Sequence, residues 1–204
     1  MGYCDDLKPA ISCIEDFYTI EKAVTLYEQS SGCKLHRDIK SEKCKILLLG
    51  KWKDWHQDNI PIKYIAKSDH LDMLGVQLFN NYVKTRQENC ESIIKKIKNK
   101  IDMWKLGKFM PLSDRARSVN IYAYSNIWFR TSVIDMRKGD EEKILSMAKS
   151  YIYMDLFEKP EEILLFRKKE EGGLGLKHIS YKAQALKIKN FIQMAANEKF
   201  IKML

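Results

Sequence analysis

The spacing of apolar side chains divides the chain near Asn80. Before that point the pattern predicts one amphipathic helix, which begins at a capping box formed by Ser12 and Glu15 and is closed by Gly32. Three short apolar runs follow the helix and are interpreted as strands, at residues 45–49, 60–65 and 71–78. The first part of the chain is therefore expected to be a small mixed unit.

Beyond Asn80 the apolar period is that of helices almost to the end of the chain. Apolar residues from Ile93 to Trp104 keep helical spacing, while lysines fill the other faces. Further helices are predicted to begin near Pro111, Asp140 and Ile179. The fold class expected from this order is α+β, with a short antiparallel sheet and a helix followed by a mostly helical unit.

Composition and charge narrow the choice of partners. The chain has 204 residues, of which 45% are hydrophobic, so it is long enough to bury a core. Its formal net charge of +9 favours a polyanionic partner such as nucleic acid, although a soluble surface with a basic bias would look the same. No apolar run approaches the roughly 18 residues of a membrane span, so no membrane partner is expected.

The cysteines and histidines indicate neither a disulfide framework nor a zinc site. Five cysteines are an odd number, and none lies in a C-x-x-C pair or at a short spacing from histidine. We interpret them as reduced thiols of an intracellular protein, present in cytoplasm and nucleus. The four histidines are too scattered for a ligand set, and aromatic residues such as Tyr122, Tyr124 and Trp128 are interpreted as core.

Two adjacent carboxylates, Asp5 and Asp6, are the strongest candidate for chemistry. Like charges a few ångströms apart repel one another unless a cation lies between them. Phosphoryl transfer by two metal ions uses carboxylates on a rigid support, and Mg²⁺ is the hard cation that such oxygen ligands suit. A pair of aspartates by itself is more typical of an exposed turn, so both interpretations stay open at this level.

The residues around the pair add a resemblance. The segment from Gly2 to Leu7, GYCDDL, resembles the aromatic-x-Asp-Asp signature of reverse transcriptases. Later segments are similar, in the same order, to blocks of the LINE-type family of non-LTR retrotransposons. These segments are SSGCKL at 30–35, KILLLG at 45–50 after Lys43, LDMLGV at 71–76, LSDRARSVN at 112–120 and EGGLGL at 171–176.

The resemblance implies a domain organisation and roles for particular residues. Residues 1–80 would be the carboxy-terminal part of a palm, and residues 81–204 a helical thumb-like domain that contains the GGLGL segment. The implied catalytic and primer-site residues are Asp5 and Asp6 as metal ligands, Lys43 as the acid for the departing pyrophosphate, and Tyr3, Cys4, Leu74 and Gly75 beside the primer end. His36 stands where the family has Asn, and Met73 where it has an aromatic residue.

The implied activity is two-metal nucleotidyl transfer with an RNA template, a DNA primer and Mg²⁺. The family's other metal-binding Asp and its fingers precede the blocks found here, so we expect a fragment of an RNA-directed DNA polymerase that is inactive alone. Lys95, Lys96, Lys98, Arg115 and Arg117 are expected to contact duplex phosphates, although a solvated helix face is the plain alternative.

Two other functions stay open from the sequence. The first is a non-catalytic nucleic-acid-binding module that keeps the palm and thumb scaffold. The second is an interaction protein that associates through an unpaired sheet edge, because an edge strand offers unpaired backbone groups to another chain.

Overall fold

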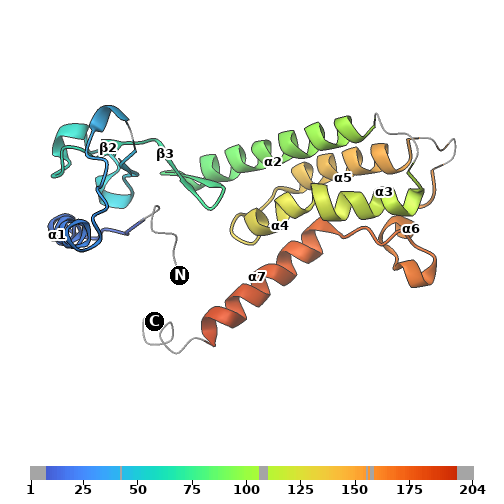
Figure 1. Ribbon diagram of the computed structural model, residues 1–204. Helices are drawn as coiled ribbons and strands as arrows, with labels where there is room; N and C mark the ends of the chain where they lie inside the picture. Colours follow the sequence, from blue (N-terminus) through green and yellow to red (C-terminus); the bar gives the residue numbers. More distant parts are fainter. Residues whose placement is uncertain (1–7, 42, 106–109, 155, 157–158, 197–204) are drawn as a thin grey trace. The chain divides into compact units, whose positions relative to one another are not determined.

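The computed structural model describes residues 8–41, 43–105, 110–154, 156 and 159–196 (Figure 1). Helices dominate, and two short two-stranded sheets accompany them, which confirms the α+β class. The chain forms two compact units, described separately below. The first unit runs to Met73 and includes Leu78–Asn81, and the second consists of Leu74–Gln77 and the chain from Tyr82 onward.

The first helix of the mixed unit, α1 (Ile14–Ser31), has its cap one residue later than predicted. Cys13 is the N-cap residue, and the carboxylate that closes the box belongs to Asp16 rather than Glu15. Asp16 accepts hydrogen bonds from the backbone N–H groups of Ser12 (2.7 Å) and Cys13 (3.0 Å). These donors lower the pKa of Asp16 to about 2. The predicted capping box is therefore present, but it is formed by Cys13 and Asp16 rather than by Ser12 and Glu15.

The other end of α1 follows the prediction, and one face of the helix is tied to the loops around it. Gly32 adopts φ 72° and closes the helix in the left-handed conformation that glycine tolerates. Glu21 accepts a hydrogen bond from the Tyr64 hydroxyl, and Arg37 pairs with Glu21 at 3.3 Å and with Glu28 at 2.7 Å. This network holds the chain after Gly32 against the helix.

The strands of the first unit are shorter than the apolar runs that predicted them. Strand β1 (Lys45–Ile46) pairs in parallel with β2 (Ala66–Lys67). Leu48 is buried just beyond β1, and Ile60 is buried directly after the short helical turn Gln57–Asn59, and neither lies in a strand. The strands were predicted too long because a short apolar run indicates that its side chains are buried, and buried side chains also occur on irregular backbone.

The predicted strand at 71–78 is instead a hairpin, which provides the expected antiparallel pair. Strands β3 (His70–Met73) and β4 (Val76–Phe79) are joined by the two residues Leu74 and Gly75, whose φ angles are 51° and 81°. Positive φ at both central residues is the hallmark of the type I′ turn, whose twist matches that of antiparallel strands. The apolar run at 71–78 therefore contains a reversal of the chain at Leu74 and Gly75.

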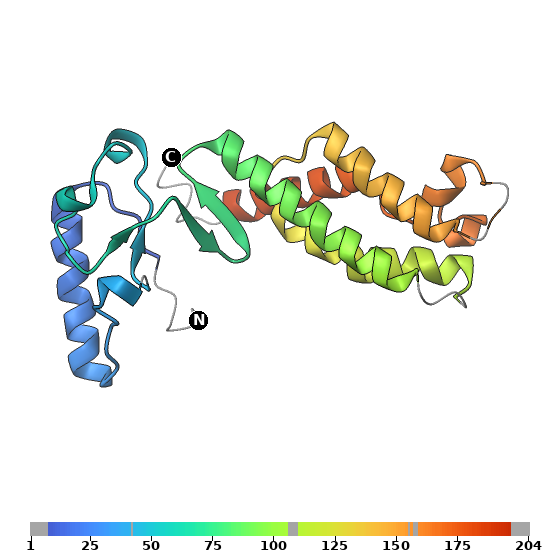
Figure 2. The ribbon, with the colours of Figure 1, turned by 90° about the horizontal axis from the view of Figure 1, so that it is seen from above.

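The second unit is a helical bundle closed by an irregular segment (Figure 2). Its elements are α2 (Tyr82–Trp104), α3 (Leu112–Ser118), a π-helical turn (Val119–Ala123), α4 (Ser125–Thr131), α5 (Lys138–Ile152), α6 (Glu162–Phe166) and α7 (Ile179–Ala195). Helix α2 packs against α5 and α4, and α7 packs against α4.

The core of this bundle follows from the helical period. Ile93, Ile97 and Ile101 of α2 are buried one turn apart and belong to the same apolar cluster as Ile144 and Ala148 of α5. Side chains at intervals of three or four residues share one helix face, so this stripe faces the partner helix. The lysines between the isoleucines are thereby left on the outer surface.

Candidate functional site

The catalytic residues proposed from the sequence fall mostly outside the described residues. Tyr3, Cys4, Asp5 and Asp6 all lie there, so the metal and catalytic assignments stay predictions. Within the described ranges, no group of three or more His, Cys, Asp or Glu side chains could hold a metal ion. Lys43, the remaining catalytic candidate, is exposed just before β1.

The hairpin turn presents an apolar side chain to solvent. Leu74 is 77% exposed at the tip, and its backbone lies in the left-handed region that side chains other than glycine rarely adopt. Gly75 follows it with the same sign of φ. The two residues expected near a primer end therefore form the tip of a tight, solvent-facing turn.

The predicted basic surface of α2 is present. Lys95, Lys96 and Lys98 are exposed, and each lacks a hydrogen bond or ion pair to any described residue. No carboxylate lies between Ser92 and Ile101, so this stretch of the helix surface carries uncompensated positive charge. Such charge is what a phosphate backbone attracts.

The two arginines of α3 differ, and one prediction is corrected. Arg115 is only 6% exposed, and its guanidinium donates a hydrogen bond to the backbone carbonyl of Ile152 at 3.2 Å. It therefore connects α3 to the end of α5 and does not reach a phosphate on the surface. Arg117, two residues later, points to the opposite side of the helix and is exposed.

Two of the segments that carry the family resemblance meet through one side chain. Asn120, the last residue of LSDRARSVN, donates from its amide nitrogen to the carbonyl of Gly175 at 2.9 Å. Its amide oxygen accepts a hydrogen bond from the N–H of Lys177 at 2.9 Å. The two residues that flank Leu176 are thus fixed by a side chain more than fifty positions earlier.

The two adjacent glycines of the EGGLGL segment, Gly172 and Gly173, are each required by the local backbone, for different steric reasons. Gly172 adopts φ 79° and ends a short helical turn. A Cβ on Gly173 would lie 2.2 Å from the carbonyl oxygen of Arg167, so only glycine fits without a backbone shift. Beyond it, the N–H of Leu174 donates to Leu164 and that of Leu176 to Leu165, at 2.9 and 2.8 Å. The segment therefore folds back along α6.

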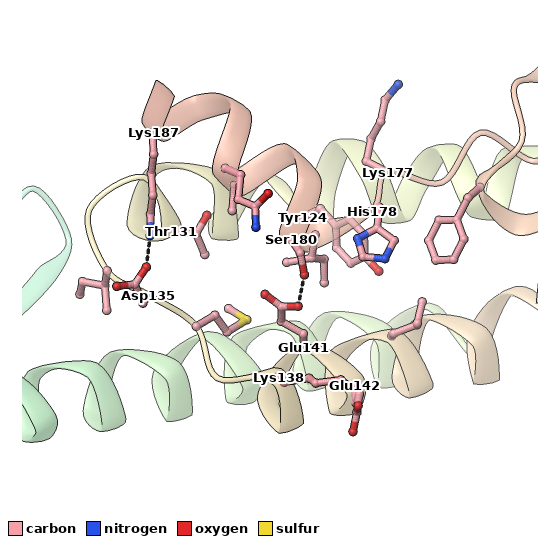
Figure 3. A pocket seen from close by; sticks show the side chains of 17 residues that line it. Tyr124, Thr131, Asp135, Lys138, Glu141, Glu142, Lys177, His178, Ser180 and Lys187 are labelled. Atoms are coloured by element: carbon pink, nitrogen blue, oxygen red, sulfur yellow. Dashed lines mark hydrogen bonds and ion pairs between the residues drawn. The ribbon is translucent and has the colours of Figure 1, made fainter. Parts of the chain in front are cut away.

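A cavity of about 520 Å³ lies beside these segments, between α4, α5 and α7 (Figure 3). This size falls in the usual range for small-molecule sites. Its apolar lining residues are Ile134, Met136, Leu145, Phe166, Ile179 and Ala183. Its polar lining residues are Tyr124, Thr131, Asp135, Lys138, Glu141, Glu142, Lys177, His178, Ser180, Gln184 and Lys187.

Two polar pairs cross this cavity from α7. The hydroxyl of Ser180 donates to the carboxylate of Glu141, and the ammonium of Lys187 pairs with Asp135 (Figure 3). The hydrogen bond from Lys187 lowers the pKa of Asp135, which also accepts a hydrogen bond from the Tyr82 hydroxyl at 3.1 Å. The ammonium of Lys187 offsets the charge of Asp135, whereas Glu141 keeps its charge and gains one hydrogen bond.

Two further polar atoms of the lining have no hydrogen-bond partner in the described part of the chain: the Tyr124 hydroxyl and Nδ1 of His178. Tyr124 is fully buried, as a core residue should be, and burial raises the pKa of its hydroxyl. The ring of His178 contacts the rings of Phe166 and Tyr181, at centroid distances of 5.1 and 4.3 Å.

Sequence reasoning missed this cavity, and no local pattern could have revealed it. Tyr124 was interpreted as core and His178 as an isolated histidine, and the two are separated by more than fifty residues. Tyr122, also interpreted as core, is instead exposed on the bundle surface.

Comparisons with known proteins do not assign the chain. No protein-family model matches it, and no curated protein matches it. No helix in the described ranges is both long enough and apolar enough to cross a membrane.

Proposed function

We propose that the chain is a fragment of an intracellular RNA-directed DNA polymerase of the non-LTR retrotransposon type. In this proposal its helical unit binds the sugar–phosphate backbone of a template–primer duplex. The observation that carries the proposal is the outer face of α2, where Lys95, Lys96 and Lys98 are exposed and uncompensated. The contact of Asn120 with Gly175 adds support, because two of the resembling segments form one structural feature.

Binding by this face would be electrostatic and independent of base sequence. Each lysine that neutralises a phosphate releases condensed counterions, so affinity falls steeply as salt is added. Lys100 is tied to the carbonyl of Tyr122 at 2.7 Å and borders the same face. Arg117 extends the positive charge onto α3, whereas Arg115 is excluded by its burial.

The catalytic part of the proposal rests on Asp5 and Asp6. In the polymerase they would hold Mg²⁺ with a further aspartate from another segment, and Lys43 would donate a proton to the departing pyrophosphate. Two carboxylates alone leave most of the ion's coordination to water, so the isolated chain is expected to bind Mg²⁺ weakly. We therefore expect no primer extension by this chain alone.

A titration of a labelled RNA–DNA primed duplex at several salt concentrations tests the binding proposal. The test variant replaces Lys95, Lys96 and Lys98 together by Gln. We expect the slope of log affinity against log salt to fall by about 2 to 3, which corresponds to the loss of three phosphate contacts. Equal slopes for variant and wild type would contradict the proposal.

A matched control removes the same charge from lysines that are already paired. Lys105, Lys143 and Lys149 of the same unit lie 3.7, 3.8 and 2.5 Å from the carboxylates of Asp102, Asp140 and Glu162. Replacing these three lysines by Gln should change the salt slope much less than the test variant does. A similar loss in both variants would show that net charge alone attracts the duplex.

The alternative is a non-catalytic nucleic-acid-binding module on the same scaffold, and it is favoured by the self-contained apolar core of the helical unit. Both functions predict the salt-dependent binding above. The two functions make different predictions for the coding sequence upstream of Met1. An in-frame segment with a further metal-binding aspartate would support the polymerase. Replacing Asp5 and Asp6 by Asn should leave duplex affinity unchanged under either function.

A further inference from the structure

One side of helix α7 packs on the bundle, and the opposite side is exposed and apolar. The residues that line the cavity from α7 share the inner side: Ile179, Ser180, Ala183, Gln184 and Lys187. The opposite side carries apolar residues at alternating intervals of four and three: Tyr181, Ala185, Ile188, Ile192 and Ala195. The helical period of about 3.6 residues places these five residues in one stripe, on the side away from the cavity. We call this stripe the α7 seam.

The α7 seam has little cover in the described part of the chain. Ile188 and Ile192 are each 60% exposed, and Phe191 beside them is 69% exposed. Tyr181 is 71% exposed, although one side of its ring stacks on His178. Single exposed apolar side chains need no explanation, but a contiguous stripe of them marks an interaction surface. Another molecule is therefore expected to bury the seam.

The spacing of the seam fits a second helix better than it fits a flat surface. Intervals of four and three are those of the a and d positions of a heptad, where side chains of one helix insert between those of its partner. The small side chains of Ala185 and Ala195 flank the large ones of Ile188 and Ile192, which leaves recesses for the side chains of a facing helix. Two heptads are short for an isolated coiled coil, but α7 is already held by its contacts with α4.

The charges beside the seam indicate an acidic partner. The chain has no Asp or Glu between Glu171 and Glu198, so α7 has no carboxylate of its own. Lys182 and Lys189 lie on one flank of the seam, at heptad positions that form ion pairs between helices. Both lysines are exposed, and neither is paired with a carboxylate of the described residues. A second copy of α7 offers them no carboxylate, whereas a partner helix with glutamates beside its apolar stripe does.

We propose that the α7 seam binds an amphipathic helix of another protein, in which Glu or Asp residues flank the apolar stripe. Removal of the seam from water supplies the driving force. The ion pairs with Lys182 and Lys189 select acidic helices over basic ones. This partner is a protein, so the inference does not depend on the duplex binding proposed for the outer face of α2.

Two synthetic peptides of about three heptads test the proposal, both with Ile at a and Leu at d. The acidic peptide carries Glu at every e and g position, and the basic peptide carries Lys there. The fluorescence anisotropy of a dye on the peptide measures binding to the whole chain, in about 0.15 M salt to screen attraction by net charge. We expect the acidic peptide to bind at least about tenfold more tightly than the basic one. Equal affinities, or no binding of the acidic peptide, would overturn the proposal.

The test variant replaces Ile188 and Ile192 by Gln, which keeps a good helix former and removes apolar surface from the seam. It should bind the acidic peptide at least about tenfold more weakly than the wild type. The matched control replaces Ile121 and Ile163 by Gln, because these isoleucines are also exposed but lie outside α7. Circular dichroism checks that both variants fold, and the control should bind as the wild type does. If the two variants bind alike, the seam is not the docking site.

Replacing Lys182 and Lys189 by Gln tests the charge separately. The acidic peptide should bind about threefold more weakly to this variant, with a smaller dependence on salt, and the basic peptide should bind no more weakly than before. An unchanged preference for the acidic peptide would contradict the choice of an acidic partner.

The whole chain alone tests the other possible occupants of the seam. We expect it to sediment as a monomer and to bind vesicles of phosphatidylserine and phosphatidylcholine no more tightly than the Ile188 and Ile192 variant does. A dimer that this variant abolishes would show that a second copy covers the seam, and vesicle binding that it abolishes would show a lipid surface; either result would refute the proposal. The same variant should keep the salt slope of duplex binding, so the two proposals can fail independently.

Discussion

The side-chain amide of Asn89 satisfies both backbone groups of Gln77. Its oxygen accepts a hydrogen bond from the Gln77 N–H at 3.0 Å, and its nitrogen donates to the Gln77 carbonyl at 2.7 Å and to the Thr85 carbonyl at 2.7 Å. Asn89 is only 1% exposed within α2. The amide therefore takes the place of a neighbouring strand beside β4 and attaches that strand to the helix.

Replacing Asn89 by Asp should destabilise the chain by about 3 kcal/mol, because a carboxylate cannot donate to two carbonyls and would be buried beside them. Chemical denaturation followed by circular dichroism measures the loss. Asn99→Asp is the matched control, since Asn99 is exposed on the same helix. Equal stability of the two variants would show that the amide contributes little.

Replacing Asn120 by Ala should cost about 1 to 3 kcal/mol of the free energy of unfolding, because two hydrogen bonds to the backbone around Leu176 are lost. Amide hydrogen exchange at Lys177 should accelerate more than exchange within α2. Asn126→Ala removes only local hydrogen bonds to Tyr122 and Ala123 and serves as the control. Unchanged exchange at Lys177 would show that the hydrogen bonds of Asn120 do not hold this segment in place.

The two glycines Gly173 and Gly139 should respond to alanine in opposite directions. A Cβ at Gly173 would lie 2.2 Å from the Arg167 carbonyl oxygen, so the backbone must move, and we expect a loss of about 2 kcal/mol. Gly139 lies in α5 with no atom within 4 Å of a new Cβ, so alanine should raise stability by roughly 0.5 kcal/mol. Thermal denaturation of both variants measures the difference, and a neutral Gly173→Ala would contradict it.

Alanine substitutions of Arg115 and Arg117 should have different effects, the first on the stability of the fold and the second on duplex binding. Arg115→Ala removes a buried side chain and its hydrogen bond to Ile152, so it should lower the free energy of unfolding by about 2 kcal/mol. Arg117→Ala should leave stability within about 0.5 kcal/mol of the wild type, because Arg117 is exposed. Only Arg117→Ala should reduce the salt slope of duplex binding without loss of fold. A loss of stability in Arg117→Ala with a reduced salt slope in Arg115→Ala would contradict the assignment of Arg115 as buried and Arg117 as exposed.

The cap of α1 should be sensitive to acid. The donors from Ser12 and Cys13 lower the pKa of Asp16 to about 2 from 3.8, so the ionised cap stabilises the fold above pH 4. Its contribution is lost as pH falls from about 4 to about 2, when the carboxylate takes up a proton. An NMR titration of Asp16 measures the pKa directly. In Asp16→Asn this part of the acid dependence should disappear, and an ordinary pKa in the wild type would refute the cap.

The sequence predicted the helices of the second unit because their information is local. The spacing from Ile93 to Trp104 predicts a helix whose inner face is apolar, and α2 has that face. Gly32 likewise marks a helix end, where the backbone needs a positive φ. The strands were less predictable, because a buried loop and a buried strand share the same short apolar run.

By itself the sequence determined the α+β class and the basic outer face of α2. Only the tertiary structure decided that Arg115 is buried, that Asn120 holds Gly175, and that Tyr124 and His178 line one cavity. The physical reason is the distance along the chain over which each effect acts. Helix periodicity and turn preferences act over a few residues, whereas these contacts join positions 37 to 55 residues apart. Such contacts exist only after helices from distant segments have packed together.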